Sequence, residues 1–396
     1  MEFLNTIPIH TDEASQEALR ISAGVRWNHI WTNENVVKSP FRDIEIPNAT
    51  YAEYVWKNLD KWATKTATVC GITGRQYTYE QIYKQSQVLG AVLRKKFRIN
   101  NGDTVAIMLP NLPEYPTAIL GVLSAGGLVT TLNPNYTAYE VQRQIHMSDA
   151  KLITVTADIV PTVKQALELC KMNIPIVVIY IESPLPEGTI SFKEIIEDNH
   201  VDLGLPKGVE LTNRNIIANV EQQNTEIKQY VDTTDSHQDN VLVSLPMFHS
   251  YGMTIVTLHK LSVGIKLVTL PRFKPETFIN TLAKYHFHLF YFAPPTVLFL
   301  GSHPQVQTKH FEHLRCVTSG AAPLPIADIE RFLEKVNANS HFCQAYGLTE
   351  TAPLPTASPL GYKEYSKVGF GLPNVELRII DENLKNRGPN ECMARG

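Results

Sequence analysis

Cysteine is scarce in this sequence and shows none of the spacings that organise metal or disulfide chemistry. The five cysteines among its 396 residues lie far apart and form no CxxC pair. Structural zinc sites usually draw ligands from such pairs, so we expect no zinc site. The odd, scattered set also argues against a disulfide framework and favours a reducing, intracellular setting.

Basic excess and long apolar runs are missing as well. Lysine plus arginine number 36 and aspartate plus glutamate 39, a formal net charge of −3, so a general nucleic-acid binder is not expected. No run of about 18 apolar residues exists, so we expect no membrane span. The first residues include Glu2 and lack the apolar stretch of a signal peptide. The last three residues, Ala394 to Gly396, are not a peroxisomal S-K-L tripeptide.

An ordinary globular composition remains. Hydrophobic residues make up 43% and charged residues 19% of the chain, which suffices for a large buried core. At about 150 residues per domain, the length allows two or three domains.

Strand and helix signals alternate along most of the chain. Thr78 with Gln81, and Thr137 with Glu140, have the capping-box spacing that predicts a helix start. The predicted helices cover residues 79–97, Tyr115–Ala125, 138–147, Val160–Cys170, Asn213–Tyr230, Pro275–Tyr285 and Ile326–Val336. The predicted strands are Thr104–Leu109, Leu128–Leu132, Leu152–Thr156, Ile176–Tyr180, Val241–Leu245, Ile265–Leu270, Leu289–Phe292 and Leu314–Thr318. This alternation predicts an α/β fold of helix-covered, mostly parallel sheets.

Four parts follow from this rhythm. Residues 1–38 are polar and predict an N-terminal arm, 39–203 a first α/β half and 204–368 a second α/β half. Residues 369–396 begin with a stretch, up to residue 380, that has the pattern of antiparallel β structure, so they predict the start of a β subdomain.

Glycines flank a lysine in the segment from Gly204 through Lys207 to Gly208. Such a loop offers backbone N–H groups and an ammonium group to an anion, and a helix is predicted to begin soon after it. The Walker A pattern G-x-x-x-x-G-K-[ST] occurs nowhere in the chain. A plain surface turn explains the pentapeptide equally well.

Two further segments have residue types suited to a nucleotide. SGAAP, residues 319–323, follows a predicted strand, and its small residues let a flat ligand approach the backbone; a tight turn is the alternative. QAYGLTE, residues 344–350, offers Tyr346 for stacking on a base, Thr349 for a phosphate oxygen and Glu350 for Mg²⁺. A strand end with a capping threonine is the alternative there.

His249 lies in the segment PMFHSYGM, residues 246–253, directly after the predicted strand Val241–Leu245. A lone histidine beside aromatic residues is often structural. Its place at the carboxyl end of a strand makes a functional role equally reasonable.

Taken in order, these segments resemble the adenylate-forming superfamily of acyl-CoA synthetases, 4-coumarate–CoA ligases and firefly-luciferase-like enzymes. The likeness spans about Ser39 to Gly396. The segments that carry it are GVLSAGG (121–127), NPNYT (133–137), LPKGVELTN (205–213), SGAAPL (319–324), QAYGLTE (344–350), VG (368–369) and LPN (372–374).

The resemblance implies a ligase of two-step chemistry. A carboxylate attacks the α-phosphorus of ATP, magnesium pyrophosphate leaves, and the acyl-adenylate then reacts with the thiol of coenzyme A. The implied partners are therefore a small carboxylic acid, ATP with Mg²⁺, and coenzyme A. Fatty acids and cinnamate-type acids are both possible substrates.

The resemblance also implies a role for each matching residue. Thr349 would bind the α-phosphate and Glu350 the Mg²⁺, while His249 would lie between the acyl group and the phosphate. The remaining nucleotide positions are Gly320, Ala321, Ala322, Ala345, Tyr346, Gly347 and Leu348, with Tyr346 stacked on the adenine; the acyl side adds Ser250 and Tyr251; and the phosphate loop keeps Gly204, Lys207 and Gly208.

The phosphate loop departs from the family pattern. Relatives have a Ser/Thr/Gly-rich run before G-x-P-K-G, whereas residues 199–203 of this chain are NHVDL. The junction near Leu203 therefore predicts an internal deletion. Losing three charge-assisted hydrogen bonds would remove roughly 4–9 kcal/mol of phosphate binding. We expect impaired or absent adenylation.

The end of the chain departs too. Residues 391–396, ECMARG, resemble a shortened G-E-L-x-x-R-G, and the family's small C-terminal domain with its catalytic lysine has no counterpart here. The sequence therefore predicts a truncated isoform with slow thioester formation. We expect a cytoplasmic chain, with a peroxisomal location for full-length relatives.

Three alternatives remain open. One is a non-catalytic isoform that binds a carboxylate or AMP without releasing pyrophosphate. Another is an unstable product without function, which a thermal melt lacking a cooperative transition would support. The third is a luciferase-like monooxygenase, which light emission with luciferin would reveal.

Overall fold

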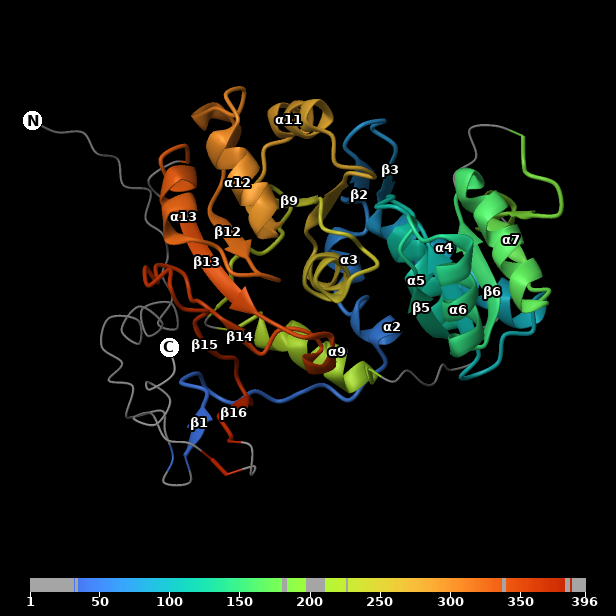
Figure 1. Ribbon diagram of the computed structural model, residues 1–396, viewed down its shortest axis with the longest axis horizontal. Coiled ribbons are helices and arrows are strands. Elements are labelled where there is room, and N and C mark those ends of the chain that lie inside the picture. The colour runs from blue at the N-terminus through green and yellow to red at the C-terminus, as the bar shows by residue number, and fades with distance from the viewer. Residues whose placement is uncertain are drawn as a thin grey trace, which may run out of the picture.

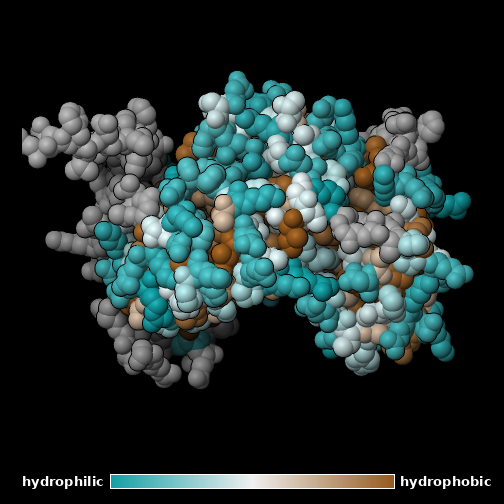
Figure 2. Space-filling view, turned by 90° about the horizontal axis from the view of Figure 1, so that it is seen from above, coloured by the Kyte–Doolittle hydropathy of each residue, from teal (hydrophilic) through white to brown (hydrophobic). Residues whose placement is uncertain are grey.

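Two α/β lobes lie next to each other in the computed structural model of the protein (Figure 1). The structure describes residues 32, 35–179, 184–196, 211–225, 227–336, 340–381 and 385–386. Among these residues, every helix is too short or too polar to cross a membrane. Figure 2 shows a mostly hydrophilic face on which hydrophobic residues form small, separate groups.

The first lobe contains a parallel sheet of five described strands in the order β5-β4-β6-β7-β8. The strands are β4 (Thr104–Met108), β5 (Leu128–Thr131), β6 (Ala150–Val155), β7 (Ile176–Val178) and β8 (Ile190–Ser191). The helices are α4 (Tyr79–Lys95), α5 (Tyr115–Ser124), α6 (Ala138–Ser148), α7 (Val160–Cys170) and α8 (Phe192–Ile196). Successive β4 side chains point to opposite faces: Val105 and Ile107 join a core with α4 and α5, and Ala106 and Met108 one with α6 and α7.

The second lobe contains a sheet of nine described strands in the order β15-β14-β13-β12-β11-β9-β10-β2-β3. Its central strands β9 (Asn240–Val243), β10 (Lys266–Thr269), β11 (Leu289–Phe292), β12 (Cys316–Ser319) and β13 (His341–Tyr346) pair in parallel. Helices α11 (Pro275–Lys284), α12 (Pro294–Ser302) and α13 (Ile326–Leu333) contribute to a core on one face. The predicted architecture of helix-covered, mostly parallel sheets is confirmed.

Strands β2 (Thr66–Cys70) and β3 (Gln76–Thr78) connect the lobes. They precede the first sheet in the chain, yet β2 pairs in parallel with β10 of the second sheet. One apolar core is shared by both lobes. It includes residues of β2, β4, α4, α5, β9 and β11.

Antiparallel strands complete the second lobe, as the pattern of residues 369–380 predicts. The strand β14 (Thr356–Ala357) pairs with β13 and β15 (Phe370–Gly371), and β16 (Glu376–Arg378) pairs with β1 (Val36–Lys38). Strand β1 therefore lies within the last residues of the expected N-terminal arm, of which residues 1–31, 33 and 34 are outside the described residues.

The predicted capping boxes hold at Thr78 and Thr137, where each hydroxyl accepts from the backbone N–H three residues later. The helix predicted over Asn213–Tyr230 is wrong in length, because α9 (Asn213–Gln222) ends eight residues earlier. The Thr225 hydroxyl donates to the Gln222 carbonyl at 2.7 Å, which satisfies a carbonyl at the helix end.

The segment after β9 is a feature that the sequence does not predict. Residues Tyr251–Leu258 form a π-helix, η3, that continues into α10 (His259–Ser262). Nearly all of its residues are buried, so its sequence lacks the alternation of apolar and polar faces that predicts a surface helix. This buried helix forms one wall of the site described next.

Candidate functional site

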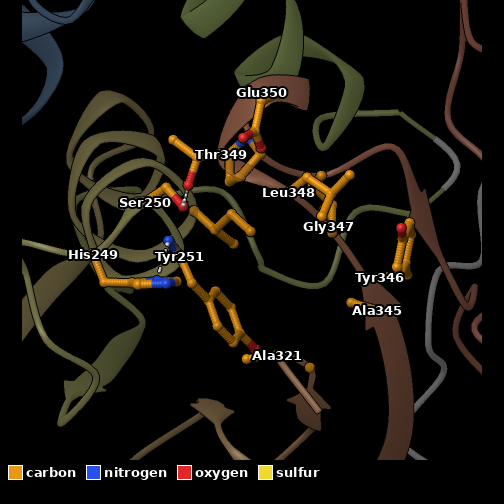
Figure 3. A pocket seen from close by; sticks show the side chains of 14 residues that line it. His249, Ser250, Tyr251, Ala321, Ala345, Tyr346, Gly347, Leu348, Thr349 and Glu350 are labelled. Atoms are coloured by element: carbon orange, nitrogen blue, oxygen red, sulfur yellow. Dashed lines mark hydrogen bonds between the residues drawn. The ribbon is translucent and has the colours of Figure 1, made fainter. Parts of the chain in front are cut away.

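One cavity of about 260 Å³, open to solvent, lies where three segments of the second lobe meet (Figure 3). The segments follow β9, β12 and β13, so they leave the sheet at the carboxyl ends of parallel strands, the usual place for a site in such sheets. The lining residues are His249, Ser250, Tyr251, Ile255, Gly320, Ala321, Ala345, Tyr346, Gly347, Leu348, Thr349, Glu350, Pro353 and Leu354.

The loop after β12 forms one wall of the cavity from small residues. A Cβ atom on Gly320 would lie 3.0 Å from the Ala345 carbonyl oxygen, so a side chain there would crowd the neighbouring strand. Ala321 has a φ of 73°, in the left-handed region that costs a non-glycine residue energy. Gly320 and Ala321 both line the cavity.

The turn after β13 carries the polar groups of the opposite wall. The Leu348 N–H donates to the Pro353 carbonyl at 3.0 Å, and the Thr351 hydroxyl donates to the same carbonyl at 2.8 Å. A Cβ on Gly347 would lie 2.3 Å from that oxygen, so the turn closes only around glycine. It leaves Tyr346 48% exposed, a large aromatic face available for stacking.

His249, Ser250 and Tyr251 connect the π-helix to this turn. The Ser250 and Thr349 hydroxyl oxygens are 3.2 Å apart, within hydrogen-bond distance (Figure 3). The Tyr251 N–H donates to His249 Nδ1 at 3.2 Å, which leaves Nε2 to carry the proton of a neutral ring. Burial raises the pKa of the Tyr251 phenol, whose hydroxyl donates to the Thr318 carbonyl at 3.2 Å.

Glu350 is the carboxylate of this cavity. It is exposed within the short helix η5 (Thr349–Thr351), next to the threonine hydroxyl. Mg²⁺ is commonly held by one or two carboxylates together with substrate phosphates, and Glu350 beside Thr349 fits that arrangement. Within the described residues, no group of three or more potential metal ligands forms a dedicated metal site.

The structure brings most of the candidate residues from three separate motifs to one cavity. Ala322 is not among the residues that line it. Gly204, Lys207 and Gly208 lie outside the described residues. Sequence reasoning missed the lining residues Ile255, Pro353 and Leu354, because apolar residues on a buried helix and in a loop carry no local signal of a site.

A second, much smaller cavity of about 20 Å³ adjoins the first. The two share Tyr251, Ile255, Ala345 and Leu354, so these residues form the boundary between them. The smaller cavity is also lined by Gln223, Ile227, Gln229, Lys260, Tyr291, Thr318 and Ala357. None of these residues belongs to a motif that the sequence singles out.

Comparison with known proteins identifies the family. The sequence matches the family model described as AMP-binding enzyme over residues 55–201 and 204–392. The chain belongs to the AMP-binding enzyme family. The resemblance to the adenylate-forming superfamily is thereby confirmed, and the interruption of the match falls at residues 202–203.

Curated relatives of this family include plant acid–CoA ligases. The chain is 30% identical to 4-coumarate–CoA ligase 3 of Oryza sativa subsp. japonica, with 91% of this chain and 69% of that protein covered. It is 29% identical to 4-coumarate–CoA ligase 1 of Arabidopsis thaliana over 408 residues, with 92% and 70% covered. Because that alignment is longer than this 396-residue chain, the Arabidopsis protein has residues with no counterpart here.

A solved structure supports the same fold. The benzoate CoA ligase from Burkholderia xenovorans LB400 superposes with a TM-score of 0.75 at 20% identity, covering 86% of this chain and 69% of that one. At this identity the likeness concerns the fold alone.

Proposed function

We propose that this cavity binds an acyl-adenylate and its precursors, ATP and a carboxylic acid, in an acid–thiol ligase of the acyl-CoA synthetase type. The observation that carries the proposal is the meeting of three motifs, around His249, Gly320 and Tyr346, at one solvent-open cavity. The family to which the chain belongs supports it, because its curated relatives are acid–CoA ligases.

The nucleotide lies along the walls formed after β12 and β13. Adenine packs on the small residues Gly320 and Ala321, with Ala322 beside them, and stacks on the exposed ring of Tyr346. Thr349 donates to the α-phosphate, and Glu350 holds the Mg²⁺ that neutralises charge on the departing pyrophosphate. Catalysis of this kind depends on position and charge more than on covalent chemistry.

The acid lies along the π-helix. The carboxylate meets the α-phosphate near His249, whose free Nε2–H can donate to the reacting oxygens, and the body of the acid extends past Tyr251. The Ser250–Thr349 hydrogen bond ties this wall to the phosphate-binding residue. The acyl-adenylate then reacts with coenzyme A.

Adenylation by this chain is impaired, since Lys207 is preceded by none of the family's Ser/Thr/Gly loop. The break in the family match at residues 202–203 supports this, because it lies immediately before Gly204. Each missing charge-assisted hydrogen bond is worth roughly 1.5–3 kcal/mol. The β- and γ-phosphates are therefore held weakly, while the adenylate half of the site is complete.

Pyrophosphate release in the presence of ATP and a carboxylic acid tests this proposal. The chain is assayed in parallel with a version that has a Ser/Thr/Gly-rich loop inserted before Gly204. Cinnamate and octanoate are the test acids. We expect turnover from the restored version and little from the chain as it stands. Equal turnover by both would refute the role of the loop, and no turnover by either would refute the ligase assignment.

A non-catalytic role is the second candidate, favoured by the same interruption of the phosphate loop. It predicts saturable AMP or carboxylate binding with no pyrophosphate from the chain as it stands. The restored version distinguishes the two, since only a ligase scaffold gains turnover from the inserted loop.

A further inference from the structure

The larger cavity depends on a segment that belongs to neither a strand nor a helix. Residues 244–249 connect the end of β9, at Val243, to the π-helix η3, and they bring His249 to the cavity. Backbone N–H and C=O groups outside regular structure have no strand or helix partners. Leu245 and Met247 are nevertheless buried, at 8% and 0% exposed. Their backbone groups therefore need partners from another part of the molecule.

One side chain of the first lobe supplies these partners. Asn111, in the turn between β4 and α5, is 6% exposed. Its amide nitrogen donates to the carbonyl oxygens of Val243, at 3.2 Å, and Leu245, at 2.8 Å. Its amide oxygen accepts from the Met247 N–H at 2.8 Å. Only an amide offers two N–H donors and a carbonyl acceptor together, so neither aspartate nor an apolar residue could replace it.

A second residue of the first lobe holds the next part of the segment. The hydroxyl of Thr131, at the end of β5, donates to the Phe248 carbonyl at 2.7 Å. Thr131 is itself fixed, because its carbonyl accepts from the Gln144 side chain of α6 at 2.9 Å. The first lobe therefore anchors the backbone of the second lobe from Val243 to Phe248.

The anchored segment sets the orientation of the His249 ring. The His249 N–H donates to the Pro246 carbonyl at 3.1 Å, and the Tyr251 N–H donates to His249 Nδ1 at 3.2 Å (Figure 3). A Cβ on Gly252 would lie 2.2 Å from the Pro246 carbonyl oxygen, so the start of η3 packs closely against the segment. A displacement of residues 244–249 would therefore move His249 and the start of η3 together.

The residues that line the larger cavity all lie between His249 and Leu354, in the second lobe. We propose that the first lobe nevertheless takes part in the site through Asn111, a positioning residue that holds His249 next to the reacting carboxylate and the α-phosphate. This inference rests on the proposed function, which places those groups near His249. The three side-chain hydrogen bonds of Asn111 go to residues 243–247 and not to the walls after β12 and β13. Loss of the amide should therefore weaken binding near His249 and spare the adenine.

Calorimetric titration of the chain as it exists tests the inference with two probes. AMP reports on the nucleotide walls, whereas an acyl-sulfamoyladenosine also occupies the region next to His249. Cinnamoyl and octanoyl analogues are compared first, and the one that binds the parent more tightly is used for the variants. We expect Asn111→Ala to weaken binding of the analogue by about 10- to 100-fold, the effect of losing a hydrogen bond to a charged group, and binding of AMP by less than about threefold.

Asn240→Ala is the matched control. Asn240 lies at the opposite end of β9, and its amide nitrogen donates to the His286 carbonyl at 3.0 Å. This variant removes a comparable hydrogen bond from the same strand and leaves the partners of residues 244–249 unchanged. We expect both affinities of the parent to be kept.

Thr131→Val decides the question if Asn111→Ala does not fold. It keeps the volume of the side chain and removes the hydroxyl that holds Phe248, so the analogue should again be weakened more than AMP, by about 2- to 10-fold. Its control is Thr281→Val on α11, where a buried hydroxyl donates to the Thr277 carbonyl at 2.7 Å and does not line the cavity.

A double-mutant cycle with His249→Ala separates positioning from general destabilisation. If Asn111 acts through His249, Asn111→Ala should weaken binding of the analogue much less in the His249→Ala background than in the parent. If Asn111→Ala does not fold, Thr131→Val takes its place in the cycle. Equal losses in the two backgrounds would overturn the inference.

The remaining outcomes separate this inference from the proposed function. If the deciding variant weakens AMP and the analogue by the same factor, or weakens neither, the role of Asn111 is overturned and the nucleotide site stands. An analogue that binds the parent no more tightly than AMP also overturns it, because His249 then contributes nothing to binding. Absence of binding of both probes to the parent overturns the proposed function and the inference together.

Discussion

Gly347→Ala is the change that tests most sharply how the turn after β13 builds the nucleotide site. The added methyl would lie 2.3 Å from the Pro353 carbonyl oxygen, whereas C···O contacts are ordinarily about 3.3 Å or more. That oxygen is fixed by the Leu348 N–H and the Thr351 hydroxyl. The turn must therefore open by about 1 Å, and Thr349 moves with it.

The magnitude follows from the cost of overpacking, roughly 1–3 kcal/mol. If the strain falls on the bound state, AMP affinity drops by about 5- to 150-fold, because 1.4 kcal/mol is tenfold. The φ of Gly347 is not in the left-handed region, so the effect is steric and not a backbone preference of glycine.

Calorimetric titration with AMP shows whether the strain weakens nucleotide binding. A thermal melt shows whether the strain destabilises the fold. Gly301→Ala is the matched control, since a Cβ there, on helix α12, meets nothing closer than 3.4 Å. We expect unchanged AMP binding in the control. A Gly347→Ala protein with both the AMP affinity and the melting temperature of the parent would refute the reasoning about this turn.

Three further predictions concern stacking, a buried ion pair and pH. Tyr346→Ala should weaken AMP binding by about 1–3 kcal/mol by calorimetry with little change in melting temperature, since the ring is 48% exposed; an unchanged Kd would contradict stacking. Arg315→Met should lower the free energy of unfolding by about 3 kcal/mol in a urea titration, because it removes the cation paired with the buried Asp239 carboxylate, whereas Arg331→Met, at an exposed arginine, should cost under about 1 kcal/mol. Burial, with the charge of Arg315, lowers the pKa of His288 to about 4. The neutral His288 ring therefore contributes stability that is complete above about pH 6.5 and is lost as the pH falls towards 4. Urea unfolding midpoints should fall over this pH range, and they should depend less on pH in the His288→Asn variant.

Local sequence signals predicted much of the fold. Threonine capping boxes fixed the starts of α4 and α6, and short apolar runs located the strands of both sheets. They also placed three motifs at strand ends, which in a parallel sheet meet at one edge. The site could therefore be anticipated from SGAAP, QAYGLTE and the segment around His249.

Other features depend on contacts between residues far apart in the sequence, so no local sequence pattern predicts them. Strand β2 pairs with β10, about 200 residues away, and no periodicity within either strand specifies that partner. Lys260 is a residue type that is usually exposed, and its burial depends on residues distant in sequence, such as Tyr230 and Tyr291, whose rings lie next to its ammonium group. The domain division at residue 203 stays a prediction.

Binding of a non-hydrolysable acyl-adenylate analogue, an acyl-sulfamoyladenosine, tests the central claim most directly. The analogue occupies the adenine, α-phosphate and acyl positions and needs no phosphate loop, so the account predicts saturable binding that is tighter than binding of ATP. Tyr346→Ala and Gly347→Ala should each weaken it. Absence of binding, or binding that neither variant alters, would contradict the assignment of this cavity as the adenylate site.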